Sequence, residues 1–152
     1  MEKKEKKEKR KAKYSISCGV IIFNINKKSP EYLLVKYPRY WGFVRGKVEP
    51  GETEELTAFR EAVEEAGIHD LIFVPGFREV TSYVFRRGDD LIRKDDVYLL
   101  GRTRSWNIHI SHEHEDIKWL SYEKAMELIK LRSLRNLLTK AHSLILTHMQ
   151  IW

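Results

Sequence analysis

The sequence predicts an α/β fold in which helices cover both faces of a mixed β-sheet. Segments rich in β-branched and aromatic residues alternate with two segments of helical periodicity, in the order strand, strand, helix, three strands, helix. The chain has 152 residues, 42% of them hydrophobic, which suits one domain with a single core. No apolar run reaches the roughly 18 residues of a membrane span, so no membrane partner is expected.

The first two predicted strands span residues 14–25 and 31–37. The turn-forming residues 26–30 between them predict a hairpin. Cys18, the single cysteine, lies in the first strand, where a small buried residue is expected. One thiol excludes an internal disulfide and a cysteine-rich zinc site, so a cytoplasmic protein is expected.

An irregular loop and a helix follow this hairpin. Residues 38–52 carry proline and glycine at intervals, which predicts the loop. Thr53 is the expected N-cap of a helix from Glu54 to Ala66, and Gly67 is its expected stop. At about 100° per residue, the helix has an apolar stripe roughly opposite a carboxylate stripe. The first comprises Leu56, Phe59, Val63 and Ala66, and the second comprises Glu61, Glu64 and Glu65.

The second half of the chain contains three more predicted strands and a second helical region. Residues 71–87 and 91–104 are expected to be strands on either side of a turn. Residues 111–120 begin as a polar loop and enter a short strand. Helical periodicity covers residues 122–149, with a break expected near Arg132.

The N-terminal segment carries most of the net charge of +6. Residues 1–13 contain eight Lys or Arg and three Glu, which gives +5 and leaves 6 − 5 = +1 for the rest of the chain. The body is therefore near neutral. We expect this tail to be a disordered, solvated extension. A weak RNA tether is the alternative, although the tail has no aromatic residue to stack on bases.

The acidic helix and the loop before it predict a site for a polyphosphate and its metal ions. Glu61 and Glu65 are an i, i+4 pair of like charge, which costs a helix roughly 0.2–0.5 kcal/mol, and Arg60 cannot neutralise all the carboxylates. An ordinary exposed acidic face is the alternative interpretation. Clustered carboxylate oxygens suit Mg²⁺ or Mn²⁺. The Gly-rich loop and the helix N-terminus add backbone N–H groups that suit an anion.

This segment resembles the Nudix box, written GX5EX7REUXEEXGU with U a bulky apolar residue. Ala62, which is small, stands at a U position as a mild departure. The resemblance implies an α/β/α sandwich over residues 14–152 and the hydrolysis of a nucleoside diphosphate linked to another group. The matching residues are Gly46, Glu52, Arg60, Glu61, Glu64, Glu65, Gly67 and Ile68.

The resemblance also implies roles for these residues. The three glutamates of the carboxylate stripe would bind the divalent metal ions, and Arg60 would orient a glutamate through a salt bridge. Glu52 would lie near the metal shell or hold the loop. Gly46 and Gly51 would let the loop turn back onto the helix.

Over nearly all of residues 15–147 the chain resembles the asymmetrical dinucleoside-tetraphosphatase branch of this family. The branch cuts diadenosine tetraphosphate into ATP and AMP, so a small-molecule nucleotide is the expected partner. Val44 and Arg45 stand where the branch usually has Pro-Lys, and Arg45 keeps a positive charge that can bind phosphate. The segments that carry the resemblance are "SCGVIIF", "WGFVRGKVEPGE" and "SHEHEDIKWLSYEKAMEL".

The cluster "SHEHE" contains further candidates. In this branch the glutamate matching Glu113 assists the metal or the water. His112 or His114 could contact phosphate when protonated. A polar surface loop is the alternative, and a zinc site lacks the ligands to close it.

Aromatic and basic residues are candidates for binding the rest of the substrate. Tyr83 and Tyr122 lie in segments that flank the cleft in this branch and are expected to hold a base. Arg86, Arg87 and Lys94 could reach the distal phosphates, or form a solvated hairpin tip. Weaker base-stacking candidates, for which core packing is an equal alternative, are Tyr40, Trp41 and Tyr98.

The expected mechanism is attack on phosphorus by a water that the metal ions activate. Either Glu61 or Glu113 takes the proton, and the sequence does not decide between them. Alternative functions are removal of pyrophosphate from RNA 5′ ends, MutT-type hydrolysis of single nucleotides, and a nucleotide-sensing module. The intact glutamates argue against the last of these.

Overall fold

The strands and helices follow the predicted order in the computed structural model, which describes residues 13–149. The predicted loop 38–52 contains two short strands that the sequence did not predict. No helix within the described part of the chain is long and apolar enough to cross a bilayer. The elements are β1 (Lys13–Asn26), β2 (Ser29–Lys36), β3 (Trp41–Gly42), β4 (Val44–Lys47), α2 (Glu54–Ala66), β5 (Ile72–Arg87), β6 (Asp90–Arg102), β7 (Asp116–Ser121), α3 (Tyr122–Leu128) and α4 (Arg132–Thr147).

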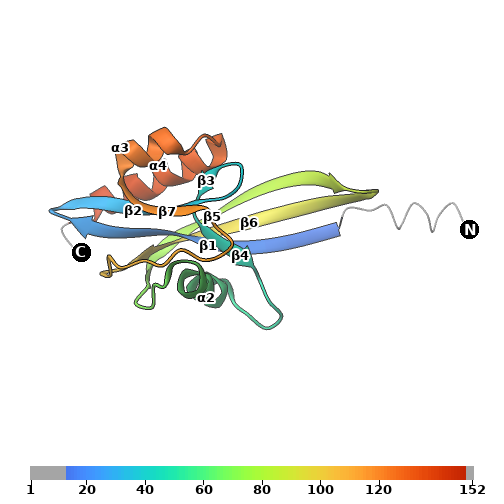
Figure 1. Cartoon of the computed structure of the whole chain (residues 1–152), viewed down its shortest axis with the longest axis horizontal. Coiled ribbons are helices and arrows are strands. Elements are labelled where there is room, and N and C mark those ends of the chain that lie inside the picture. Colours follow the sequence, from blue (N-terminus) through green and yellow to red (C-terminus); the bar gives the residue numbers. More distant parts are fainter. Residues whose placement is uncertain (1–12, 150–152) are drawn as a thin grey trace, which may run out of the picture.

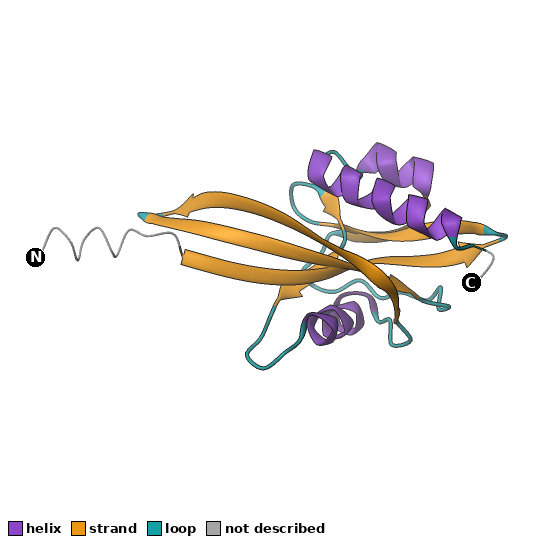
Figure 2. Cartoon of the chain, turned by 180° about the vertical axis from the view of Figure 1, so that it is seen from behind, coloured by secondary structure: helices purple, strands orange, loops and turns teal. Residues whose placement is uncertain are grey.

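Strand β1 is the centre of the sheet. It pairs in parallel with β6 along one edge, and its other edge is shared by β4 and β2, both antiparallel. Strand β5 continues the sheet beyond β6, and β2 also pairs with β3 and β7. The sheet is therefore mixed, as predicted. The start of β1 and the β5–β6 hairpin extend together as a long arm (Figure 2).

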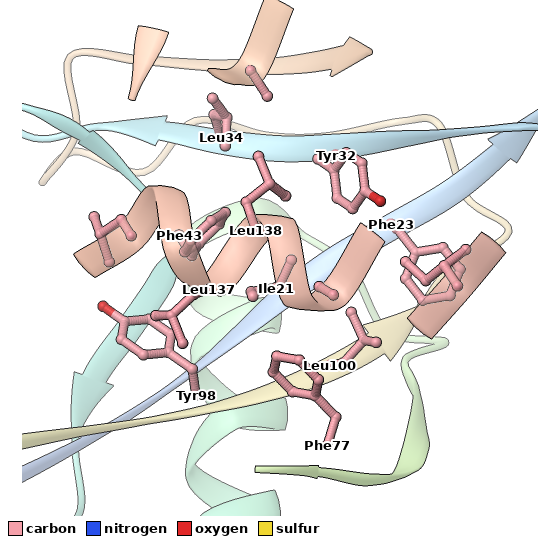
Figure 3. Packing of buried hydrophobic residues seen from close by; sticks show 14 of the residues in the cluster. Ile21, Phe23, Tyr32, Leu34, Phe43, Phe77, Tyr98, Leu100, Leu137 and Leu138 are labelled. Carbon is pink, nitrogen blue, oxygen red and sulfur yellow. The ribbon is translucent and has the colours of Figure 1, made fainter. Parts of the chain in front are cut away.

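Helices cover both faces of the sheet (Figure 1). Alternate residues of β1 point to opposite faces, so Val20 and Ile22 pack on the side of α2, whereas Ile21 and Phe23 pack on the side of α3 and α4. Figure 3 shows the second cluster, with Leu138 of α4 over the sheet. Burial on both faces explains why the first strand is a continuous apolar run. The predicted sandwich is confirmed.

Helix α2 begins and ends where predicted, but it turns a different face to the sheet. Thr53 Oγ1 accepts a hydrogen bond from the amide of Leu56 at 3.2 Å, and Gly67 adopts a left-handed φ of 70°. Leu56, predicted in the apolar stripe, is 57% exposed. Small residues allow a close approach to the sheet, and this brings Glu61 and Glu65 into buried positions. The fully buried residues of the helix are Thr57, Ala58, Ala62 and Ala66.

The remaining boundaries lie close to the predictions. The C-terminal helical region breaks at residues 129–131, just before the expected position. Cys18 is fully buried in β1, as predicted. The predicted tail lies outside the described residues except for Lys13, which begins β1 and pairs with Asp90 at 3.0 Å. The folded part therefore starts one residue before the predicted boundary, and residues 150–152 also lie outside the description.

Candidate active site

Two glycines let the loop before α2 lie against the helix. Strand β4 places Gly46 so close to Glu61 that a Cβ atom at this position would overlap the carboxylate. Gly51 turns the loop with a φ of 83°, a conformation that favours glycine. Gly46 thus allows a close approach to the helix, and Gly51 allows the turn.

Arg60 is the centre of an ion-pair network. Its guanidinium holds both oxygens of Glu52, at 2.7 and 3.0 Å, and also reaches Glu61 at 2.8 Å and Glu64 at 3.2 Å. Hydrogen bonds from Arg60 lower the pKa of Glu52 to about 2. Because Glu52 also accepts a hydrogen bond from Thr57, its oxygens are occupied within the protein. Of the two roles expected for Glu52, this geometry favours holding the loop.

Glu61 and Glu65 are buried carboxylates with fewer donors. Burial raises the pKa of Glu61, and burial followed by the charge of Glu61 raises the pKa of Glu65 to about 8. Glu65 Oε2 accepts one hydrogen bond, from the backbone amide of Arg45 at 3.2 Å. A bound cation would therefore stabilise the charged form of both carboxylates.

The segment between β6 and β7 brings His114 to the same place. Its Nε2 lies 3.0 Å from Glu65 Oε1, and the side chain is 3% exposed. This contact lacks hydrogen-bond geometry, and neither ring nitrogen has a hydrogen-bond partner among residues 13–149. Burial lowers the pKa of His114, so the ring is neutral at pH 7. This setting does not support a protonated contact with phosphate and suits a metal ligand better.

The donor set fits a divalent cation. Ligand atoms of Glu65, Glu113 and His114 all lie within 4.8 Å of one another. Glu61 and Glu64 form ion pairs with Arg60, whose guanidinium is shared with Glu52. Four carboxylates against one guanidinium leave an excess of negative charge, and oxygen ligands suit hard cations. We conclude that this group could hold a metal ion.

A cleft lies on the opposite face of the sheet, between β5, β6 and the start of α4. Its volume is about 390 Å³, within the roughly 300–1,000 Å³ of small-molecule sites. Tyr83 is 41% exposed and Tyr98 is 2% exposed, so the first lies at the opening and the second at the base. Flat aromatic walls suit a nucleobase. The lining residues are Tyr40, Arg45, Thr81, Ser82, Tyr83, Asp96, Tyr98, Leu131, Ser133 and Leu134.

Arg45 contacts both the carboxylate cluster and the cleft. Its backbone amide donates to Glu65, while its guanidinium donates to Asp96 Oδ2 at 2.9 Å and to the Tyr40 hydroxyl at 3.0 Å. The guanidinium also lies over the ring of Tyr37, 5.4 Å from its centroid. The expected phosphate ligand therefore already has a carboxylate partner.

The structure brings together some predicted substrate-binding residues and separates others. Lys94 is paired with Tyr83 across β5 and β6 and shares the face of the cleft. By strand alternation Arg86 lies on the other face of the sheet. Tyr122 stacks on His142, with ring centroids 3.9 Å apart, and does not line the cleft. The expected platform of Tyr83 with Tyr122 is not formed, because α3 packs its tyrosine against α4.

Sequence reasoning missed two residues of the site. Asp96 lines the cleft, and period-two alternation from Tyr98 in the same strand could have placed it there. Tyr37 packs edge-to-face on His114 with centroids 4.8 Å apart and stacks on Tyr40 at 4.9 Å. This aromatic contact depends on the return of the chain after β2, which no local pattern predicts.

This combination of a carboxylate-bearing helix, a returning glycine loop and a mixed sheet belongs to hydrolases that act on acid anhydrides. The model of the NUDIX domain matches residues 13–141, and the chain belongs to this family. It is a Nudix hydrolase.

Individual relatives agree with this assignment. The chain is 30% identical over 142 residues to a mouse asymmetrical bis(5′-nucleosyl)-tetraphosphatase, covering 85% of this chain and 94% of the relative. It is 27% identical to the crystal structure of a C. elegans Ap4A hydrolase binary complex, with a TM-score of 0.77 and 88% and 98% coverage. The E. coli dihydroneopterin triphosphate pyrophosphohydrolase is 25% identical, with a TM-score of 0.66 and 84% and 96% coverage.

Proposed function

We propose that the protein hydrolyses dinucleoside polyphosphates and cuts diadenosine tetraphosphate into ATP and AMP. The observation that carries this proposal is the similarity to an asymmetrical bis(5′-nucleosyl)-tetraphosphatase along 85% of the chain. The aromatic cleft supports it, because Arg45 contacts both this cleft and the carboxylate cluster, and such a substrate needs a site for a base and a site for phosphates with their cations.

The carboxylates of α2 would hold Mg²⁺ or Mn²⁺ together with Glu113. When bound, these ions lower the pKa of a water molecule and neutralise charge on the phosphoryl oxygens. Arg60 holds Glu61 and Glu64 in place through its ion pairs. The backbone amide of Arg45 holds Glu65 through a hydrogen bond.

We assign the proton of the attacking water to Glu113. Glu61 Oε1 already accepts a hydrogen bond from Arg60 at 2.8 Å, so this oxygen is held by the protein and not directed at the attacking water. Glu113 is exposed, and its ligand atom lies within reach of Glu65. Oxygen from water bonds to the phosphorus next to one adenosine, and the bond from that phosphorus to its bridging oxygen breaks. AMP then carries the new oxygen, ATP leaves with the bridging oxygen, and Glu113 keeps the proton.

Hydrolysis of diadenosine tetraphosphate in ¹⁸O-labelled water tests this proposal. We expect ATP and AMP as products, with the label in AMP alone. Two molecules of ADP would contradict asymmetric cleavage, and label in ATP alone would move the attack to another phosphorus. Turnover in excess chelator would exclude the role given to the cations.

A substrate panel separates this function from a second candidate. The similarity to a dihydroneopterin triphosphate pyrophosphohydrolase favours small triphosphates, which include nucleoside triphosphates, as an alternative. Adding these, and an RNA with a 5′-triphosphate, to the panel distinguishes the reactions through kcat/KM. A higher kcat/KM on any of them than on the dinucleotide would replace the proposed substrate.

A further inference from the structure

The cleft contains a buried carboxylate oxygen without a hydrogen bond. Asp96 is 2% exposed and lines the cleft. Its Oδ2 accepts a hydrogen bond from Arg45 at 2.9 Å, but no residue among 13–149 donates a hydrogen bond to its Oδ1. Lys94 Nζ lies 3.9 Å from this oxygen, too far for a hydrogen bond.

A buried acceptor without a hydrogen bond destabilises the folded protein unless a ligand supplies a donor. A buried polar atom without a partner carries a desolvation penalty of about 1–3 kcal/mol, more when the group is charged. The ion pair with Arg45 fixes the carboxylate, so Oδ1 cannot turn away without breaking the 2.9 Å contact. A ligand that brings an N–H group to this position would remove the penalty.

The surroundings of Asp96 define the kind of ligand. The Tyr83 hydroxyl lies near this carboxylate without reaching hydrogen-bond geometry at Oδ1, and burial and then the negative charge of Asp96 raise the pKa of Tyr83. Tyr40 and Tyr98 complete the aromatic walls. A phosphate oxygen placed at Oδ1 would be repelled, because both atoms are acceptors and both are negative. A flat ring with a donor on its edge satisfies the tyrosines and the carboxylate together.

We propose that Asp96 determines base specificity, its Oδ1 accepting a hydrogen bond from the exocyclic amino group of a purine stacked in the cleft. This inference rests on the proposed function in placing a nucleotide there. Adenine and guanine both carry an amino group, at positions 6 and 2 of the ring, and unsubstituted purine carries none. The phosphates would then extend past Arg45 towards the carboxylate cluster, since Arg45 contacts both sites.

Binding of nucleoside monophosphates tests this inference without any catalytic step. AMP, GMP and purine riboside 5′-monophosphate are titrated into the full-length protein by calorimetry. We expect AMP or GMP to bind about 10-fold or more tightly than the purine nucleotide, because a hydrogen bond to a charged acceptor is lost in the latter. Of AMP and GMP, the one that binds more tightly shows which amino group is recognised. Equal affinity for all three, or no binding of any, would overturn the proposal.

A shape-preserving variant provides the second test. In Asp96→Asn the side-chain oxygen keeps the hydrogen bond from Arg45. The amide NH₂ group then takes the place of Oδ1 and faces the ligand. The preference for the amino-bearing nucleotide should then fall to about 1. Asp95→Asn is the matched control, since Asp95 accepts hydrogen bonds from Tyr14 and Ser82 and does not itself line the cleft, and it should keep the wild-type preference. A preference that survives in Asp96→Asn would refute the role of Asp96.

The two proposals fail in different ways. If the wild type cleaves the dinucleotide but binds the purine nucleotide as well as AMP and GMP, the base inference is wrong and the proposed function stands. If AMP binds with the expected preference but the dinucleotide is not cleaved, the proposed function is wrong and the role of Asp96 stands.

Discussion

The two faces of the sheet differ in their balance of charge. On the α2 face, Arg60 pairs with Glu61 and Glu64, and two further carboxylates lie beside His114, which leaves an excess of negative charge. On the α4 face, the carboxylate of Asp96 is balanced by Arg45 and lies among tyrosines. The first environment suits cations with phosphates, and the second suits a flat ring with a donor. The comparison shows that the sheet separates a cation site from an aromatic cleft, and that β4 contributes residues to both.

The largest effect is expected on the carboxylate face. Glu65→Gln removes a charge from the cation site while keeping the shape of the side chain, so kcat should fall by about 100-fold or more. The melting temperature in chelator should not fall, because glutamine keeps the shape of the side chain and carries no buried charge at any pH. Steady-state kinetics and thermal melting measure both. Loss of the folding transition would show that Glu65 is structural.

A backbone change tests how the loop positions the same carboxylates. In Gly46→Ala the new methyl group overlaps Glu61 and pushes its carboxylate away, so kcat should fall by about 10–100-fold. Gly88→Ala is the control for backbone strain, since Gly88 has a left-handed φ of 61° but nothing within 4 Å of its Cβ position. Equal losses of kcat in both variants would mean that general strain, and not the displaced Glu61, is the cause.

The aromatic cleft should affect substrate binding more than turnover. Tyr83→Ala removes a stacking surface of about 1–3 kcal/mol, so KM should rise roughly 5- to 100-fold with a smaller change in kcat. Tyr122→Ala removes a ring that stacks on His142 away from the cleft, so it should lower the melting temperature and leave KM near the wild-type value. A larger rise of KM in Tyr122→Ala would restore the base platform expected from the sequence.

The metal-free carboxylate face should also make stability depend on pH. Glu65 has a pKa of about 8 in the folded state against an ordinary value of 4.5, so the folded state binds more protons and loses stability as the pH rises towards 8. Glu61 and Glu113 add negative charge around it, whereas Arg45 opposes them. The lowered pKa of His114 acts in the opposite direction, but only below pH 6.5.

Melting temperatures in chelator between pH 6.5 and 8 measure this dependence. We expect a fall of about 2–4 °C for each ~1 kcal/mol lost, and a smaller fall in Glu65→Gln. Glu55→Gln, an exposed change on the same helix, should retain the wild-type slope. An unchanged slope in Glu65→Gln would show that other groups cause it.

The smallest effect is expected from the charged tail. Deleting residues 1–12 keeps Lys13 and its ion pair with Asp90, so kcat/KM on a dinucleotide should stay within about twofold. Assays at two salt concentrations measure any electrostatic contribution. A loss above tenfold at low salt would show that the tail helps to bind substrate and would favour an RNA ligand.

Local patterns were sufficient for the chemistry of the box and for the elements other than the short strands β3 and β4. The hairpin, the helix with Thr53 and Gly67 at its ends, and the β5–β6 pair follow from short-range preferences that tertiary contacts did not override. The spacing from Gly46 to Ile68 identified the family because the roles of its residues depend on one loop and one helix. The setting of Arg60 among glutamates follows from the same local geometry.

Contacts between distant segments decided the rest. The helical wheel chose the wrong buried face because it weighs hydrophobicity, whereas the sheet selects the small residues that allow close approach and so buries Glu61 and Glu65. Tyr122 was assigned to the cleft by resemblance, but its packing depends on where α4 lies. The pairing of Arg45 with Asp96 joins residues 51 positions apart, and it exists because β1 holds β4 on one edge and β6 on the other. No local preference encodes such a pair, since its geometry depends on the register of three strands.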